Sequence, residues 1–381
     1  EIDPAVLNEA LRITAQEWPQ FQVTLHRGLF WHYFESTDLL PTAQPENKAP
    51  CAPLYTPERR NKLIYRVTYF GARINLEMFH AVTDGNGGLL YLKSIVRNYL
   101  ALRHPGELDS VPSPNSASAA ARVQDSFRNF YEGSRREKHA EKVKVYHPHG
   151  MRLPYNQLQF FEGHLSAKQV LERSRALGVS MTSYLGTRFM LAIYHDMPAL
   201  ERKKPICISL PVNLRNYYPS ETARNFFNSV CIAHTLTPED TLETVAPVFD
   251  AKLKEVLKPE NIRAQMDAYE KLEHIPGIRP VPLVIKNAAV KFFTKLEDRH
   301  VSAVVSNMGR VSIPEGMKPY IHNFAAFSSC KTLFTVVCSY GDDLVLGTAS
   351  ALRSTAILQR LYREFAKDGL DVTLYATEVE R

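Results

Sequence analysis

Two strand-like segments followed by a glycine-rich loop constrain the fold of this chain more than any other stretch. Residues 63–70 (LIYRVTYF) and 73–80 (RINLEMFH) are separated by the Gly-Ala pair at 71–72. Two β-type runs with a short glycine-containing connection predict a β-hairpin. Apolar residues at helical spacing begin near Gly88 and end before the His-Pro-Gly stretch at 104–106, which predicts a helix. The expected unit is strand, turn, strand, loop and helix.

Helical and strand patterns alternate through the rest of the chain without a regular βαβ rhythm. We expect helices that begin at Asp3-Pro4 and end at Trp18-Pro19, and helices in residues 165–178, 182–195 and 354–369. We expect strands near residues 156–161, 204–215, 228–236 and 301–309, a hairpin around residues 341–343, and a final strand at 371–377. This order predicts a mixed α/β fold with partly antiparallel sheets and flanking helices.

The chain has 381 residues, which is long for one simple domain. Residues 107–150 are polar, rich in Ser, Pro and Ala, and then basic, as in a crossover between two lobes. We therefore predict an N-terminal lobe at 1–150 and a C-terminal lobe at 151–381. No apolar run approaches the ~20 residues of a membrane-spanning helix.

Charge and cysteine usage limit the classes of partner and site. The net charge is +6, and much of the excess lies between Arg135 and Lys144. Such a run is a solvated connector or a patch for an anionic partner such as an acidic carrier protein. Aromatic residues do not interleave with it, so we expect no nucleic-acid partner. The five scattered cysteines form no CxxC pair, which favours a reduced, cytoplasmic setting and disfavours a zinc site.

The stretch 77–88 (EMFHAVTDGNGG) carries the chemistry-bearing residues. The alternation of Ile74, Leu76 and Met78 puts His80 on their face, so we expect His80 at the buried end of a strand. A calcium loop starting at Asp84, a dinucleotide fingerprint and a P-loop each lack required residues here, and no third metal ligand lies nearby. The sequence itself leaves two interpretations: His80 is a general base, or it is a core histidine with Asp84 capping the next helix.

Several blocks resemble a known superfamily. Residues 79–96 (FHAVTDGNGGLLYLKSIV) resemble the HxxxDG motif of the chloramphenicol-acetyltransferase superfamily, which includes peptide-synthetase condensation domains, plant BAHD acyltransferases and alcohol O-acetyltransferases. Residues 177–196, 211–230 and 305–314 resemble further blocks of that superfamily, in the same order. Phe79 stands where condensation domains usually carry a first histidine, and the plant DFGWG motif is absent. The likeness is therefore greatest to stand-alone, alcohol O-acetyltransferase-like proteins.

The resemblance implies a two-lobed chloramphenicol-acetyltransferase-like fold with an active-site tunnel between the lobes. It implies an acyltransferase that uses acyl-CoA as co-substrate, with no bound cofactor and no metal, on an alcohol or amine acceptor. An O-acyl product is favoured over an N-acyl product, and acetyl is one candidate acyl group. Two alternatives stay open: a carrier-protein-dependent, condensation-like enzyme, and a non-catalytic binding member of the fold.

The resemblance also implies roles for individual residues. His80 would be the general base, and Asp84 would turn away from it to pair with Arg215 of the other lobe. Gly85 would permit the turn that presents His80. Further candidates are Ser306 and Asn307 as oxyanion donors or parts of a strand-end turn, and Asn225 as a tunnel residue or a strand cap.

One amphipathic segment is separate from these blocks. Residues 280–296 (PVPLVIKNAAVKFFTKL) are basic and apolar, a composition that suits either a membrane surface or a helix packed in a lobe. We expect the packed helix and no contact with a membrane.

Overall fold

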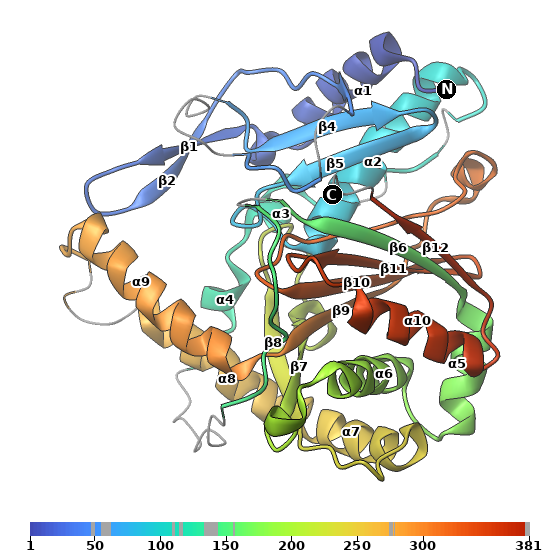
Figure 1. The fold of residues 1–381 in the computed structure, drawn as a ribbon. Helices are drawn as coiled ribbons and strands as arrows, with labels where there is room; N and C mark the ends of the chain where they lie inside the picture. The colour runs from blue at the N-terminus through green and yellow to red at the C-terminus, as the bar shows by residue number, and fades with distance from the viewer. Residues whose placement is uncertain are drawn as a thin grey trace.

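The structure is a computed structural model that describes residues 1–46, 50–54, 62–108, 111–113, 117–132, 144–154, 157–273, 277 and 279–377. Figure 1 shows two layered regions, with the N-terminal elements above a larger C-terminal sheet and its helices. Most of the basic run at 135–144 lies outside the described residues. The boundary expected at residue 150 stays a prediction.

The N-terminal region contains the expected strand, turn, strand, loop and helix. Its elements are α1 (Pro4–Glu17), β1 (Val23–Arg27), β2 (His32–Ser36), β3 (Gln44–Pro45), β4 (Tyr65–Phe70), β5 (Arg73–Met78) and α2 (Gly85–Arg103). Strands β4 and β5 pair in antiparallel fashion across the two-residue turn, which confirms the hairpin. Helix α1 begins and ends where expected. It begins at Pro4 because the Asp3 side chain accepts hydrogen bonds from the amides of Ala5 and Val6.

The C-terminal region is built on a seven-stranded sheet with the strand order β12-β6-β11-β10-β9-β7-β8. Strand β9 is parallel to β7 and β10, and the other pairs are antiparallel. The mixed sheet confirms the expected fold class. The strands are β6 (Gln159–Ser166), β7 (Ile206–Asn213), β8 (Phe227–His234), β9 (Ala303–Arg310), β10 (Leu333–Tyr340), β11 (Asp343–Ser350) and β12 (Val372–Ala376).

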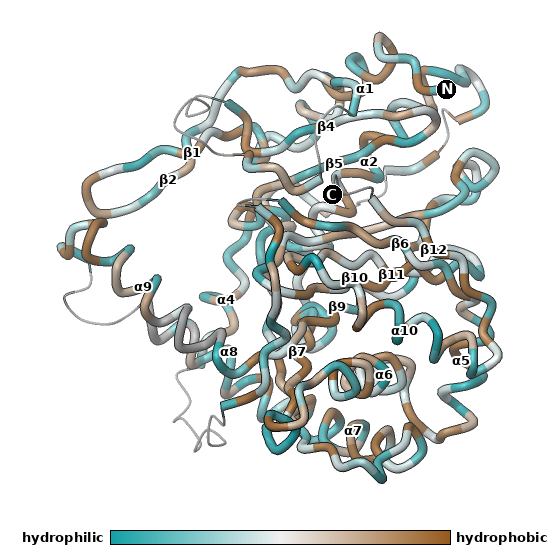
Figure 2. The backbone as a smooth tube through the Cα atoms, in the orientation of Figure 1, coloured by the Kyte–Doolittle hydropathy of each residue, from teal (hydrophilic) through white to brown (hydrophobic). Residues whose placement is uncertain are grey.

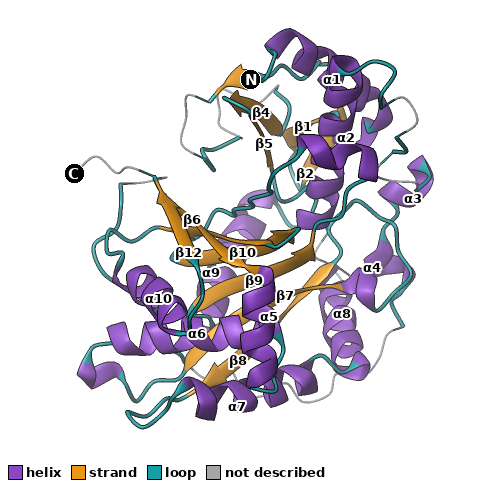
Figure 3. Cartoon of the chain, turned by 90° about the vertical axis from the view of Figure 1, so that its right-hand side faces the viewer, coloured by secondary structure: helices purple, strands orange, loops and turns teal. Residues whose placement is uncertain are grey.

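Helices cover this sheet and connect its strands (Figure 3). The α-helices are α3 (Ala119–Val123), α4 (Ser126–Asn129), α5 (Ala167–Ala176), α6 (Met181–Asp196), α7 (Leu242–Val256), α8 (Pro259–Glu273), α9 (Leu283–Glu297) and α10 (Ala356–Lys367). The 3₁₀ helices are η1 (Pro19–Phe21), η3 (Ala199–Glu201), η4 (Leu214–Asn216), η5 (Asp298–His300) and η6 (Glu315–Tyr320).

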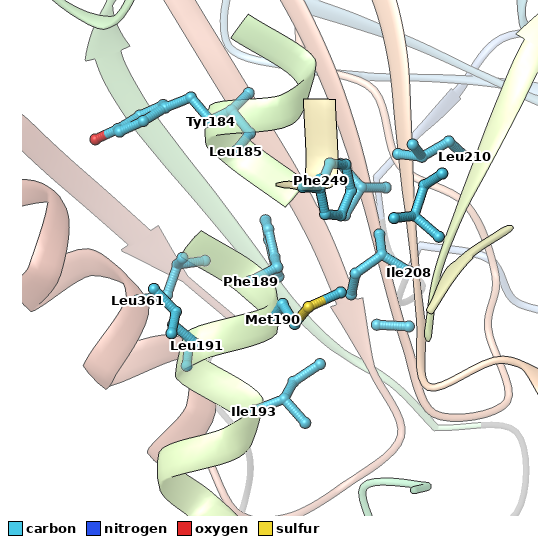
Figure 4. Close-up of a cluster of buried hydrophobic side chains, with 14 of the residues drawn as sticks. Tyr184, Leu185, Phe189, Met190, Leu191, Ile193, Ile208, Leu210, Phe249 and Leu361 are labelled. Atoms are coloured by element: carbon cyan, nitrogen blue, oxygen red, sulfur yellow. The ribbon is translucent and has the colours of Figure 1, made fainter. Parts of the chain in front are cut away.

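Two large apolar clusters fix these layers. One fills the space between the sheet and α6, α7 and α10, with Phe189 and Phe249 fully buried (Figure 4). The other joins the two regions, because Leu11 of α1 and Ile95 of α2 belong to the same cluster as Val345 of β11. The buried apolar surface that holds the regions together also fixes the position of the loop after β5.

Helix α9 differs from expectation. Leu283 is buried, but Val284, Ile285 and Val290 are 59–66% exposed. The expectation that the apolar side chains of this segment pack inside the lobe is wrong for these three residues. Among the described residues, no helix combines the length and the apolar character needed to cross a membrane.

Candidate active site

His80 lies in a turn directly after β5. The strand ends at Met78, the amide of Phe79 donates to the carbonyl oxygen of Ile64 at 2.9 Å, and the amide of Val82 donates to the carbonyl oxygen of Phe79 at 3.0 Å. His80 is exposed. The prediction of a buried His80 is therefore wrong, because the alternation of a strand ends where the chain turns.

The two carboxylate oxygens of Asp84 hold different parts of the chain. Oδ1 accepts from the amide of Gly87 at 3.0 Å and so caps α2. Oδ2 accepts from the amide of Phe226 at 2.9 Å and from Nη1 of Arg215 at 2.7 Å. The cap explains why α2 begins at Gly85, three residues before the expected start. Asp84 is thus both a helix cap and the partner of Arg215.

Arg215 organises the loop that follows it. It lies in η4 after β7, and its Nε and Nη2 atoms donate to the carbonyl oxygen of Thr222 at 3.0 and 2.8 Å. Nη2 also donates to the carbonyl oxygen of Arg224 at 2.7 Å. The side chains of Arg215 and Asp84 are only 10% and 7% exposed. The rigid fork of the guanidinium therefore joins the loop at 222–226 to the loop that carries His80.

Asn225 and Phe227 contact His80 from the C-terminal region. Asn225 donates from Nδ2 to the carbonyl oxygen of His80 at 2.8 Å. Its Oδ1 atom is buried and has no hydrogen-bond partner among the described residues. The ring of Phe227 lies 5.6 Å from the ring of His80, centre to centre. Asn225 and Phe227 therefore hold His80 from the other region, and a tunnel or strand-cap role for Asn225 stays a prediction.

The first turn of α2 lies close to the loop at 222–226 at Gly87. A Cβ atom there would lie 2.2 Å from Oγ1 of Thr83 and 2.3 Å from the carbonyl oxygen of Ala223. Thr83 Oγ1 itself donates to that carbonyl at 2.6 Å. At Gly85 a Cβ would meet only the side chain of Met308, at 3.3 Å, and φ there is not positive. The surroundings and backbone of Gly85 therefore do not require glycine, whereas the contacts of Gly87 do.

Ser306 and Asn307 point to opposite faces of β9. Asn307 donates from Nδ2 to Oγ1 of Thr182 in α6 at 3.0 Å, and its Oδ1 accepts from the amide of Gly309 at 2.8 Å. Ser306, half-buried, lies on the face toward the N-terminal region. Met308, two residues further along the strand, contacts the position that a Cβ of Gly85 would occupy. The two candidates are therefore not equivalent, because the Asn307 amide is already engaged.

The described residues give no support for a metal site, and the thiols of Cys51, Cys330 and Cys338 have raised pKa values. In the part of the chain that the structure describes, no three His, Cys, Asp or Glu side chains gather as metal ligands would. Burial raises the pKa of the Cys51 and Cys338 thiols to about 12 and that of Cys330 to about 11. Such thiols hold little of the nucleophilic thiolate.

Comparison with known proteins connects this geometry to a fold. No family model matches the chain. Uncharacterized proteins from two strains of Mycobacterium tuberculosis are 26% identical over 262 residues, which covers 64% of this chain. The chain spans about 58% of the length of these curated relatives.

Solved structures match over nearly the whole chain. Polyketide synthase associated protein 5 from Mycobacterium tuberculosis has a TM-score of 0.57 and 14% identity, covering 96% of this chain and 90% of that one. F. sporotrichioides TRI101, complexed with coenzyme A and T-2, has a TM-score of 0.56 and 11% identity, covering 98% and 91%. The first condensation domain of the CDA synthetase has a TM-score of 0.50 and 14% identity, covering 96% and 86%.

The chain has the condensation-domain fold. This confirms the two-lobed α/β fold that the sequence resemblance implied. In this condensation-domain fold, the structure brings His80, Asp84, Arg215 and Asn225 together. Sequence reasoning missed Thr83 and Ala223 as contact residues. No local signal marks them, because their partners lie 136 to 140 positions away in the chain.

Proposed function

We propose that this protein is an acyltransferase that moves an acyl group from a coenzyme A thioester to an alcohol or amine, with His80 as general base. The observation that carries the proposal is the held but exposed imidazole. The backbone of His80 is fixed by Asn225, its ring lies against Phe227, and the side chain remains accessible. A general base needs both a fixed position and access to substrate.

The proposed reaction needs no acyl-enzyme. His80 takes the proton of the acceptor hydroxyl or amine while the acceptor oxygen or nitrogen attacks the thioester carbonyl carbon. The carbonyl oxygen of the tetrahedral intermediate carries the negative charge. When the carbonyl re-forms, the carbon–sulfur bond breaks, and the thiolate of coenzyme A takes the proton back from the His80 imidazolium. We expect the base to contribute ~10²–10⁴-fold to the rate.

Asp84 has a structural role in this proposal. Its two oxygens already accept hydrogen bonds from Gly87, Phe226 and Arg215, so no relay to His80 is needed. For the intermediate, we favour Ser306 over Asn307 as the oxyanion donor. Ser306 faces the N-terminal region, whereas the Asn307 amide donates to Thr182. A preorganised donor of this kind stabilises the charge that develops in the transition state.

The test is thiol release from acetyl-CoA and longer acyl-CoAs with a panel of alcohols and amines. Wild type and His80→Ala are compared with His149→Ala as the matched control. His149 is also exposed, but it lies at the other end of β7 from His80. It neighbours Tyr146, whose amide donates to the carbonyl oxygen of Pro205 just before β7. Phe227, which contacts His80, pairs with Asn213 at the opposite end of that strand.

We expect acceptor-dependent release in wild type and His149→Ala, faster with alcohols than with amines, and its loss in a folded His80→Ala. Release that survives in His80→Ala would reject His80 as the base. Absence of release with every donor and acceptor would reject the coenzyme A proposal.

A carrier-protein-dependent transferase is a second candidate. It is favoured by the likeness to a condensation domain and to a polyketide synthase associated protein. In this case the acyl group is presented on a carrier protein, and basic residues such as those at 135–144 would attract an acidic partner. Transfer from an acylated carrier protein that weakens with added salt, together with no transfer from acyl-CoA, would favour it.

A further inference from the structure

We propose that the tip of the β1–β2 hairpin and the exposed side of α9 together form a docking surface for an anionic lipid bilayer. We call residues 27–34 and 279–294 the hairpin–α9 surface. The proposal concerns a region that the acyl-transfer mechanism does not use, so it stands or falls independently of the proposed function.

The first observation is an exposed apolar stripe on α9. Val284, Ala288 and Phe292 follow one another at four-residue spacing, and Ile285 lies beside them on the same side of the helix. All four residues are exposed, and the exposed fraction of Val284, Ile285 and Phe292 is 59–66%. The stripe is an apolar face of the kind that interfacial helices bury in a bilayer.

The second observation is that the hairpin tip extends this stripe. Leu29, Phe30 and Trp31, at the turn between β1 and β2, are exposed by 71%, 38% and 50%. Figure 2 shows the hydrophobic colour both at this turn and at the neighbouring end of α9. The turn between β1 and β2 and the start of α9, which lie far apart in the sequence, are side by side at one edge of the molecule (Figure 1).

The two parts are held together by specific contacts. The amide of Leu283 donates to the carbonyl oxygen of Leu29 at 2.9 Å. Lys286 donates from Nζ to the carbonyl oxygen of Phe30 at 3.1 Å, and its ammonium lies 3.3 Å from the centre of the Trp31 ring. The hairpin tip and the start of α9 therefore present their apolar side chains as a unit.

The charge of this surface selects lipid as the occupant. Residues 27–34 and 279–294 contain Arg27, Arg279, Lys286 and Lys291 and no Asp or Glu. Each basic side chain near an anionic bilayer adds electrostatic attraction to it. Tryptophan and lysine side chains concentrate at the boundary between lipid and water. Exposed apolar side chains on two segments that carry basic residues and no acidic ones thus complement anionic headgroups over acyl chains.

The chain carries its own reporter for this contact. Of the two tryptophans, Trp18 is 1% exposed and Trp31 is 50% exposed. We would mix the protein with vesicles of phosphatidylcholine alone, or with added phosphatidylglycerol, and measure co-sedimentation and tryptophan emission. We expect binding to the anionic vesicles only, a blue shift of the emission that Trp31→Phe removes, and weaker binding as salt is added.

Two variants make the test specific. Ile285→Glu places a negative charge in the stripe, and we expect it to weaken vesicle binding at least about tenfold. Phe70→Glu is the matched control. Phe70 is 66% exposed at the β4–β5 turn, with the Arg73 guanidinium 5.7 Å from its ring, but it belongs to no stripe. Circular dichroism and thermal unfolding should be unchanged in both variants.

Three results would overturn the proposal. The first is the absence of binding to anionic vesicles. The second is binding that Ile285→Glu leaves intact or that Phe70→Glu weakens equally. The third is a wild-type protein that does not bind the vesicles but forms a concentration-dependent dimer, which Ile285→Glu dissociates. The surface would then join two copies of the chain.

Discussion

In the part of the chain that the structure describes, two buried Asp–Arg pairs use the same chemistry in different places. Asp84 and Arg215 connect residues 131 positions apart and join the loop of His80 to the loop at 222–226. Asp368 and Arg188 connect α10 to α6 within the C-terminal region. Both pairs have side chains no more than 10% exposed.

The partners of the two carboxylates differ. Besides its arginine, Asp84 accepts from the backbone amides of Gly87 and Phe226. Asp368 instead accepts from the side chains of Tyr184 and Arg173. Burial, together with the Asp368 carboxylate, raises the pKa of Tyr184 above its ordinary value.

This difference separates two uses of a buried ion pair. A carboxylate that binds backbone amides fixes the path of loops, whereas one that binds side chains on helices fixes helix packing. We therefore expect the Asp84–Arg215 pair to affect both stability and catalysis, and the Asp368–Arg188 pair to affect stability alone. The predictions that follow can break or sharpen this contrast.

The largest effect is expected for Asp84→Ala. It leaves the Arg215 charge buried without its partner, which costs about 3–5 kcal/mol of unfolding free energy, and it releases both loops. Urea unfolding and acyl-transfer rates corrected for the folded fraction would measure the two losses. His80→Ala is the control, because its exposed side chain should be removed without a loss of stability. If Asp84→Ala and His80→Ala lowered the free energy of unfolding equally, that result would contradict the structural role of Asp84.

Arg188→Met is expected to cost a similar amount of stability, about 3–5 kcal/mol, and to leave kcat/KM of the folded protein unchanged. The reason is that Asp368 loses its buried partner while the contacts of Asp84 remain. The same unfolding and rate measurements apply. A fall in kcat/KM comparable to that of Asp84→Ala would erase the contrast between the two pairs.

Gly87→Ala should have an intermediate effect. Its Cβ would overlap the backbone carbonyl of Ala223, and overpacking of this kind costs about 1–3 kcal/mol. Gly85→Ala is the matched variant, since its Cβ meets only the flexible end of Met308, and it should be nearly neutral. Thermal unfolding of the two variants side by side measures the difference, and similar losses would contradict the close approach at Gly87.

The smallest effect is expected for Asn225→Ala, which removes one hydrogen bond to the His80 backbone, worth about 1 kcal/mol. If Asn225 positions His80, kcat falls while KM is unchanged. Asn225→Asp, which has no N–H to donate, should behave in the same way. A rise in KM with kcat unchanged would instead make Asn225 a contact of the acceptor.

Local signals predicted much of the fold. The cap at Asp3 and the hairpin turn at 71–72 are encoded within a few residues, so the ends of α1 and the β4–β5 pairing followed from the sequence. The burial of His80 did not, because alternation cannot tell where a strand stops. The exposure of the α9 stripe was missed for a related reason, since a pattern of apolar residues does not say what covers them.

Local sequence signals predicted less of the candidate site. The Asp84–Arg215 contact was expected only from family resemblance, because no local rule links residues so far apart. The need for glycine at 87 depends on a carbonyl group of another loop. Similarly, only the register of β9 and the position of Thr182 distinguish Ser306 from Asn307.

The most direct test of the central claim is a double-mutant cycle of kcat/KM for Asp84→Ala and Arg215→Ala. If the pair holds the site as a unit, removing both residues should be little worse than removing one, with a coupling energy of about 1–3 kcal/mol. Additive losses in this cycle would contradict the account, because Asp84 and Arg215 would then act on catalysis independently.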